Sequence, residues 1–164
     1  MGKVSIRPMK ESDLTFIHEG LSETNWQDIP SDQREVVTRE EADKKVSDDF
    51  ARFRREKRFK FKVFVATSED VRPVGYVSVG ELMNPTVGIR LGSVLDFWVS
   101  ERFRSQGIGS ALLDYALSYI KKQGYSHASI MVSTSNQRAL QMYAKRGFVP
   151  DRIHLVKRIR DADD

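Results

Sequence analysis

The sequence predicts a single α/β domain in which helices cover both faces of a mixed sheet, and three observations support this prediction. The chain has 164 residues, of which 40% are hydrophobic and 30% charged, the balance of an ordinary globular protein with one core. Strand-like and helix-like segments follow one another in the order β-α-α-β-β-β-α-β-α-β. Residues 93–100 are apolar on both faces apart from Asp96, which is typical of a central strand covered on both sides.

Six segments have the alternation or the β-branched and aromatic residues of strands. They are residues 4–9, 59–67, 74–82, 93–100, 126–132 and 153–160. A short turn separates the second from the third, so we expect these two to form a hairpin. The polar stretch 22–33 contains Pro30 and predicts a loop. The acidic tail, 161–164, is expected to be frayed.

Four segments have helical spacing and carry signals for helix ends. They are residues 11–21, 38–57, 107–124 and 135–147. Thr38 precedes Glu41 by three residues, which is the spacing of a capping box before the second helix. Gly124 is placed to end the third helix, and Ser135 or Asn136 to cap the fourth.

Composition narrows the class of function. The absence of cysteine excludes disulfides, thiolate metal sites and a cysteine nucleophile, and the three histidines lack metal-ligand spacing, so no metal is expected. No apolar run has the length of a membrane span and the first residues lack a signal-peptide core, so we expect a cytoplasmic protein without a membrane partner. The net charge of +4 suits an anionic ligand but is too small to indicate nucleic-acid binding. The densest basic run, 52–62, fits the end of an exposed helix that passes into a strand.

Two glycines, Gly107 and Gly109, lie between the strand 93–100 and the clearest helix of the chain. Glycine lets the backbone approach a ligand closely, and the first turn of a helix offers unpaired N–H groups at the positive end of its dipole. Arg104, three residues earlier, can add a charge-assisted contact. The segment therefore predicts a site for a phosphate or pyrophosphate. A tight turn that needs glycine only for its conformation would have the same sequence.

Two known phosphate-binding motifs do not fit this segment. A dinucleotide fingerprint requires glycine or alanine where this chain has Leu112, with an acidic residue further along a βαβ unit. A P-loop requires Gly-Lys-Ser or Gly-Lys-Thr, and neither is present. The glycine pair alone leaves phosphate binding and a purely structural turn about equally open.

Two segments taken together resemble the GNAT superfamily of acyl-CoA-dependent N-acetyltransferases. VSERFRSQGIGSALL is similar to its motif A, in which Arg104, Gly107 and Gly109 occupy the characteristic positions. STSNQRALQMYAKRGF is similar to its motif B, and the matching residues are Asn136, Ala139, Tyr143, Gly147 and Phe148. Each motif is weak alone, but both occur here in order on a strand–helix–strand–helix background.

This resemblance implies one N-acetyltransferase domain, residues 1–160, with a mixed central sheet, flanking helices and two splayed parallel strands, 93–100 and 126–132. Acetyl-CoA would lie between those strands as co-substrate. Its pyrophosphate would be held by the backbone N–H groups of Gln106, Gly107, Ile108, Gly109 and Ser110. The pantetheine arm would pair with the main chain of Phe97 and Val99. Arg104, Asn136 and Tyr143 would add contacts to the co-substrate.

The resemblance further implies direct attack of an amine on the thioester. Tyr143 is the natural general acid for the leaving thiolate, because a phenol holds its proton at neutral pH. A tyrosine packed in the core would have the same spacing. Asp96 can accept the proton of the amine or bind a cationic acceptor, and Glu81 is a second candidate. By alternation Asp96 shares a strand face with Trp98, and a carboxylate beside an indole suits a cationic amine.

The acceptor is expected to be a small amine or polyamine, a protein N-terminus or a lysine. Trp26, Asp28 and Asp32 lie in the predicted loop and can recognise a cation, although a solvated polar loop is the simpler interpretation. A non-catalytic acyl-CoA-binding regulatory module of the same fold is the alternative, against which Tyr143 argues. A nucleic-acid-binding domain would depend on the run 52–62 and lacks a reading motif. The sequence leaves the oligomeric state open, with a homodimer among the options.

Overall fold

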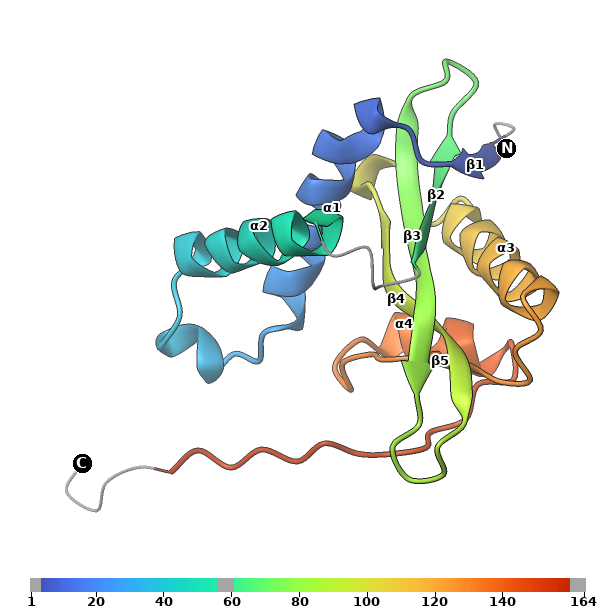
Figure 1. Cartoon of the computed structure of the whole chain (residues 1–164). Coiled ribbons are helices and arrows are strands. Elements are labelled where there is room, and N and C mark those ends of the chain that lie inside the picture. The colour runs from blue at the N-terminus through green and yellow to red at the C-terminus, as the bar shows by residue number, and fades with distance from the viewer. Residues whose placement is uncertain (1–3, 56–60, 160–164) are drawn as a thin grey trace. The chain divides into compact units, whose positions relative to one another are not determined.

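The computed structural model of the chain describes residues 4–55 and 61–159 (Figure 1). The chain forms two compact units, Met1–Ser133 and Thr134–Asp164. The first unit contains the whole sheet, and the second contains one helix followed by an extended segment. The predicted α/β fold with a mixed sheet and flanking helices is confirmed.

The sheet of the first unit has five strands in sequence order. They are β1 (Ser5–Pro8), β2 (Lys62–Thr67), β3 (Pro73–Met83), β4 (Arg90–Val99) and β5 (Ala128–Ile130). The first four strands pair antiparallel, so β2 and β3 form the predicted hairpin, and β4 pairs parallel with β5. The parallel pair requires a crossover connection, which α3 supplies.

Helices cover both faces of this sheet. The first unit contains α1 (Leu14–Asp28), α2 (Arg39–Arg55) and α3 (Ile108–Lys122), with short 3₁₀ turns at Glu11–Asp13, Gln33–Glu35 and Glu101–Phe103. Figure 1 shows α1 and α2 beside one face and α3 beside the other. Glycines allow close packing at both helix–sheet contacts. A Cβ on Gly20 of α1 would lie 2.5 Å from Tyr76, and one on Gly92 of β4 would collide with Ile120 of α3.

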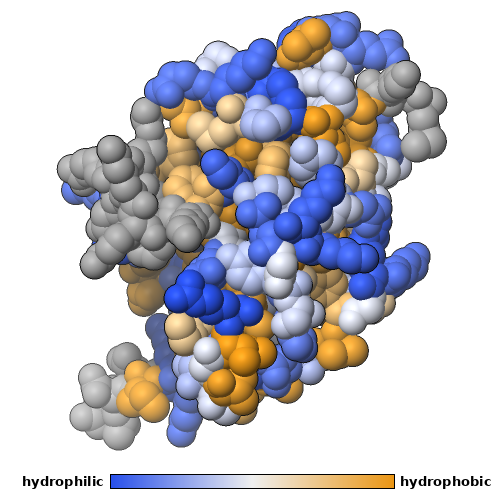
Figure 2. Space-filling model, turned by 45° about the vertical axis from the view of Figure 1, so that its right-hand side comes forward, coloured by the Kyte–Doolittle hydropathy of each residue, from blue (hydrophilic) through white to orange (hydrophobic). Residues whose placement is uncertain are grey.

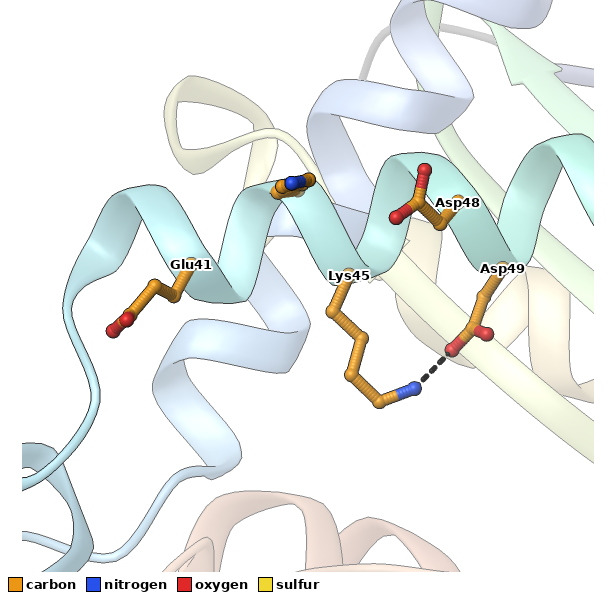
Figure 3. A pocket seen from close by; sticks show the side chains of 5 residues that line it. Glu41, Lys45, Asp48 and Asp49 are labelled. Atoms are coloured by element: carbon orange, nitrogen blue, oxygen red, sulfur yellow. Dashed lines mark hydrogen bonds and ion pairs between the residues drawn. The ribbon is translucent and has the colours of Figure 1, made fainter.

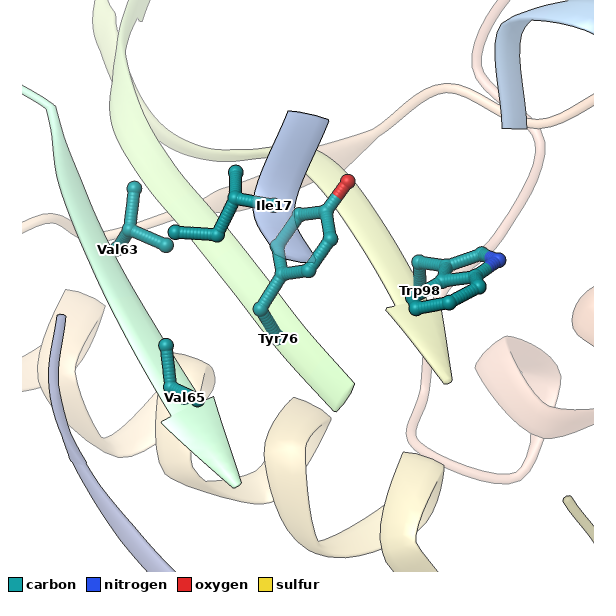
Figure 4. Packing of buried hydrophobic residues seen from close by; sticks show 5 residues of the cluster. All are labelled: Ile17, Val63, Val65, Tyr76 and Trp98. Atoms are coloured by element: carbon teal, nitrogen blue, oxygen red, sulfur yellow. The ribbon is translucent and has the colours of Figure 1, made fainter. Parts of the chain in front are cut away.

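The core beneath α1 contains large apolar side chains from three strands and the helix. Its members are Ile17, Val63, Val65, Tyr76 and Trp98 (Figure 4). The ring of Phe16 packs edge-on against Trp98 at 5.2 Å between centroids. Helix α3 contributes Leu112, Leu113 and Ala116 to the core, and all three are fully buried. The molecular face in Figure 2 has hydrophilic side chains across its middle and hydrophobic patches around them.

Several predicted helix ends are confirmed by their hydrogen bonds. The backbone N–H of Glu41 donates to Thr38 Oγ1 at 3.2 Å, and Glu41 Oε2 accepts from the N–H of Thr38 at 2.8 Å, so the capping box is present. Gly124 has φ of +84° and follows the C-cap of α3, Gln123, with the left-handed conformation expected of a terminating glycine.

The predicted loop at 22–33 is wrong over its first part, because α1 continues to Asp28. The helix end is closed by Arg34, whose guanidinium donates to the carbonyls of Trp26 and Gln27. Arg34 and Arg39 also place their guanidinium carbons 5.2 and 5.5 Å from the centre of the Trp26 ring. These long-range contacts stabilise a helix whose composition resembles a loop.

The predicted last strand, 153–160, is also wrong as far as residue 159, because the described residues 151–159 form no strand. Their large apolar side chains are exposed: Ile153, Leu155, Val156 and Ile159. Alternation alone does not make a strand when no partner strand accepts its hydrogen bonds. Parts of these predictions lie outside the described residues: residue 160, the tail 161–164, and residues 59–60 of another predicted strand. The predicted strand 126–132 shortens to the three residues of β5.

Candidate active site

Strand β4 changes its partners halfway along its length. Its parallel pairing with β5 joins Gly92 to Ala128 and Val94 to Ile130 and then stops. The antiparallel pairing with β3 continues to Val99, but its register shifts, so that Leu95 has no partner and forms a bulge. Beyond the bulge no strand of the described residues pairs with the second edge of β4. The predicted splay of the two parallel strands is confirmed.

The bulge also determines which main-chain groups of β4 face β3 and which face the open edge of the strand. The N–H of Ser100 donates to the carbonyl of Val74 at 2.9 Å, so by alternation the main chain of Trp98 faces β3. The main-chain groups of Phe97 and Val99 therefore face the open edge, as the resemblance implied for the pantetheine arm.

A side-chain hydrogen bond connects the loop after β4 to the end of that strand. Arg104 donates from Nε to the carbonyl of Val99 at 3.0 Å, and the amide nitrogen of Gln106 donates to the carbonyl of Arg102 at 3.1 Å. Ser105 and Gly107 both have positive φ, at 65° and 82°. Two left-handed residues on either side of Gln106 give the loop the curvature of an anion-binding nest.

Helix α3 begins at this loop without a side-chain cap. Gly107 is its N-cap, and the first bond within the helix runs from the N–H of Ala111 to the carbonyl of Gly107 at 3.0 Å. The N–H groups of Ile108 and Gly109 precede this bond and point out of the helix end. At 15 residues the helix is long enough to have a developed dipole, which adds positive potential at this end. The arrangement can bind an anion.

Gly109 has a structural role besides any contact with a ligand. A Cβ at this position would lie 3.1 Å from Cζ of Phe97, so glycine lets the first turn of α3 pack directly against β4. Gly107 is required by its left-handed conformation. The structural interpretation of the glycine pair is therefore supported, and because the same turn exposes backbone donors, phosphate binding stays a prediction.

Asp96 lies on the α1 face of β4 beside Trp98 and accepts a hydrogen bond from the hydroxyl of Tyr76. Burial raises the pKa of Asp96 above its ordinary value. The bonds from Tyr76 and from the N–H of Phe97 lower this pKa, whereas the negative charge of Asp28 raises it. Burial also raises the pKa of Tyr76, so its hydroxyl stays protonated and donates.

Asp28 is the last residue of α1 and keeps an exposed side chain. Partial loss of hydration raises its pKa. A carboxylate at this position also faces the negative end of the helix dipole, which disfavours its charge further. The negative charge of Asp28 is near enough to Asp96 to raise the pKa of that carboxyl.

Glu81 lies away from this pair, further along β3, where it is paired with Gly92. Its two carboxylate oxygens are already occupied, by Arg90 at 2.8 Å and by the hydroxyl of Tyr125 at 2.7 Å. The structure does not bring Glu81 to Asp96.

The second unit contains the two remaining candidates, at the start and near the end of α4 (Gln137–Ala144). The side-chain oxygen of Asn136 caps this helix by accepting from the N–H of Ala139 at 3.1 Å, which leaves its amide nitrogen for other contacts. Tyr143 is 7% exposed and packs 5.9 Å from the ring of Phe148.

A separate surface depression runs along α2 (Figure 3). Its lining side chains all come from this one helix: Glu41, Lys44, Lys45, Asp48 and Asp49. Lys45 and Asp49 form an ion pair at 2.6 Å, and the surface is that of a solvated helix face. Among the described residues no group of three or more histidines and acids is arranged to hold a metal ion, and no helix has the length and apolarity needed to cross a bilayer.

The fold is that of an α/β protein in which a helix N-terminus without a side-chain cap, set at the open edge of a splayed sheet, can receive a phosphate-bearing ligand. The chain belongs to the Acetyltransferase (GNAT) family, whose model matches residues 23–148. An uncharacterised N-acetyltransferase of Methanocaldococcus jannaschii is 31% identical over 94 residues, which cover 54% of this chain and 42% of that protein. Human N-acetyltransferase 8 is 31% identical over 85 residues, 52% of this chain and 37% of that protein. The chain thus spans under half the length of these curated relatives.

Solved structures share the fold at lower sequence identity. A putative acetyl transferase from Pyrococcus furiosus superposes with a TM-score of 0.80 at 23% identity, over 96% of this chain and all of that one. The aminoglycoside N-acetyltransferase AAC(6')-Iy, solved in complex with CoA, has a TM-score of 0.67 at 16% identity, over 98% of this chain and 97% of that one.

Proposed function

We propose that this protein transfers an acetyl group from acetyl-CoA directly to a primary amine, within one N-acetyltransferase domain over residues 1–160. The observation that carries the proposal is the uncapped N-terminus of α3 at the open edge of β4. Membership of the GNAT family and the CoA complex of a protein with the same fold support it.

The co-substrate would be bound chiefly by backbone groups. The N–H groups of residues 106–110 would receive the pyrophosphate, and Arg104 holds the loop that presents them. The main chain of Phe97 and Val99 would pair with the pantetheine amides, because its groups face the open edge of β4. The amide nitrogen of Asn136, which the helix cap does not use, would donate to a pantetheine carbonyl.

In the transfer, the amine nitrogen attacks the thioester carbonyl carbon and forms the new C–N bond. The oxyanion then collapses, the C–S bond breaks and the sulfur leaves as a thiolate. Tyr143 would give the proton to this sulfur, and Asp96 would take the proton that the amine loses. A raised pKa makes Asp96 a stronger base than an ordinary aspartate. Glu81 is the weaker candidate because its carboxylate already binds Arg90 and Tyr125.

The acceptor would approach as a cation along the α1 face of β4. The charges of Asp28 and Asp96 disfavour each other, so an ammonium between them would relieve the repulsion. This ammonium would lose its first proton to solvent, and Asp96 would take the second proton, which the nitrogen loses on attack. This favours a primary amine that is protonated in water, in a small molecule, a protein N-terminus or a lysine.

The test is acetyl-CoA binding by calorimetry together with CoA release on a panel of primary amines. Gly107→Ala should weaken binding because it disturbs the backbone donors. Gly124→Ala is the matched control, since it puts the same side chain into a similar left-handed conformation at the other end of α3, where a Cβ has open space. Equal losses in both variants would show that strain, not the cradle, explains the effect. Tight binding with no turnover on any amine would favour a regulatory acyl-CoA-binding module.

A further inference from the structure

The indole N–H of Trp98 is buried and has no hydrogen-bond partner among the described residues. The residue is only 8% exposed. Nearly all buried donors in folded proteins are paired, because an unpaired one loses its hydration without compensation. The other tryptophan, Trp26, is more exposed and has the guanidinium groups of two arginines near its ring. The unpaired N–H of Trp98 therefore needs an explanation that the fold alone does not give.

The indole is held too tightly to turn towards another acceptor. The Phe16 ring packs edge-on against it at 5.2 Å, and the Tyr76 ring lies 6.4 Å away. Gly20 leaves space on its remaining side, where a Cβ would lie only 2.8 Å from the indole. In Figure 4 the indole nitrogen points away from Tyr76 and Val65. The N–H thus has a fixed direction.

The position of this donor relates it to the acceptor amine. Trp98 follows Asp96 by two residues on the same face of β4, so their Cα atoms are about 6.6 Å apart. In the proposed function the ammonium binds Asp96, so atoms one or two bonds from its nitrogen would lie on the same face of β4 as the indole. Because the indole N–H only donates, the group that it meets has to be an acceptor.

We propose that Trp98 donates a hydrogen bond to an oxygen on the carbon next to the one that carries the reacting amine, and so selects α-amino carbonyl or vicinal amino-oxygen compounds. The proposal rests on the proposed function and narrows its list of acceptors. Polyamines and the side chain of lysine have no oxygen beside their amine, and a protonated polyamine nitrogen cannot accept. An N-terminal residue of a peptide and a vicinal amino alcohol both have one.

Three small amines test the proposal: propylamine, 2-methoxyethylamine and alaninamide. The measured quantity is kcat/KM for each oxygen-bearing amine relative to propylamine, which cancels general losses of active protein. Trp98→Phe keeps an aromatic ring in the core and removes the N–H, so this ratio should fall about five- to tenfold, the worth of one hydrogen bond. Trp26→Phe, the same substitution at the other tryptophan, should leave it unchanged. A fall with only one of the two amines identifies the oxygen as carbonyl or ether.

A ratio that Trp98→Phe does not change would overturn the inference while leaving acetyl transfer in place. If the parent acetylates none of the amines, the proposed function fails. A binding experiment then tests the hydrogen bond from Trp98 independently of acetyl transfer. In the CoA-saturated protein the indole N–H resonance of Trp98, assigned by its loss in Trp98→Phe, should move downfield with 2-methoxyethylamine and not with propylamine. The same response to both amines, or to neither, refutes the hydrogen bond.

Discussion

The hydroxyl of Tyr76 lowers the pKa of Asp96, so its removal should move the pH dependence of the proposed acetyl transfer in a known direction. Tyr76 is fully buried and donates to the carboxylate of Asp96. This bond favours the charged form and lowers the pKa of Asp96, against the upward effect of burial. Tyr76→Phe removes the donor and keeps the ring, so the pKa of Asp96 should rise further.

The size of the change follows from the type of bond. A hydrogen bond to a charged group is worth about 1.5–3 kcal/mol, and one pKa unit corresponds to about 1.4 kcal/mol. The pKa of Asp96 should therefore rise by about one unit or more. A base with a raised pKa loses its proton only at higher pH, so the acid limb of kcat/KM should move upward by the same amount.

Asp28→Asn is the matched variant, and it should shift the pKa of Asp96 in the opposite direction from Tyr76→Phe. The negative charge of Asp28 raises the pKa of Asp96, so its neutralisation should lower that pKa and move the acid limb to lower pH.

The assay is kcat/KM against pH for parent and both variants, with a ¹³C NMR titration of the aspartate carboxyls in which Asp96→Asn assigns the signal. Shifts in the same direction for both variants, or no shift in either, would refute the assignment of Asp96 as the base.

Two further predictions concern the general acid and the stability of the fold. Tyr143→Phe should lower kcat about 10²-fold or more with little change in CoA affinity, as measured by single-turnover kinetics and calorimetry; an unchanged kcat across the pH range would exclude this residue as the acid. Arg7 holds the carboxylate of Asp13, which is 2% exposed, with two bonds of 2.6 and 2.9 Å. Arg7→Met should cost about 3 kcal/mol of unfolding free energy at neutral pH, because it leaves a buried charge unpaired. Arg7 lowers the pKa of Asp13, so in the parent this stability is present above the ordinary aspartate pKa and is lost as the pH falls. Urea unfolding at several pH values should therefore show the two proteins converging in acid, and a difference independent of pH would contradict the ion-pair explanation.

Features that depend on a few neighbouring residues could be predicted from the sequence. The capping box of Thr38 and Glu41, the terminating Gly124 and the Asn136 cap all follow from hydrogen bonds that close within one helical turn. The start of α3 at Gly107 belongs to the same group. In each case the interacting atoms are close along the chain, so spacing is sufficient evidence.

Features that depend on contacts between distant residues could not be predicted in this way. The continuation of α1 to Asp28 is stabilised by Arg34 and Arg39, which pack on Trp26 from beyond the helix. The bond from Tyr76 to Asp96 exists only because the β3–β4 register sets the two side chains on one face. A strand's sequence gives its alternation, but the partner across the sheet is fixed by register.

The bulge at Leu95 sets which side chains of β4 face each layer, and so where the two proposed substrates would bind. Before the bulge, Gly92 faces α3, as its contact with Ile120 shows, and strict alternation would turn Asp96 to that same buried face. The extra residue reverses the alternation, so Phe97 faces α3 and Asp96 faces α1. The main-chain groups of the residues that pack on α3 then face the open edge, where the thioester arm is expected. The side chains of the intervening residues face the opposite layer, where the amine is expected. In the proposed function, a single unpaired residue would thereby separate the binding of the acetyl donor from the binding of its acceptor along the same four residues of β4.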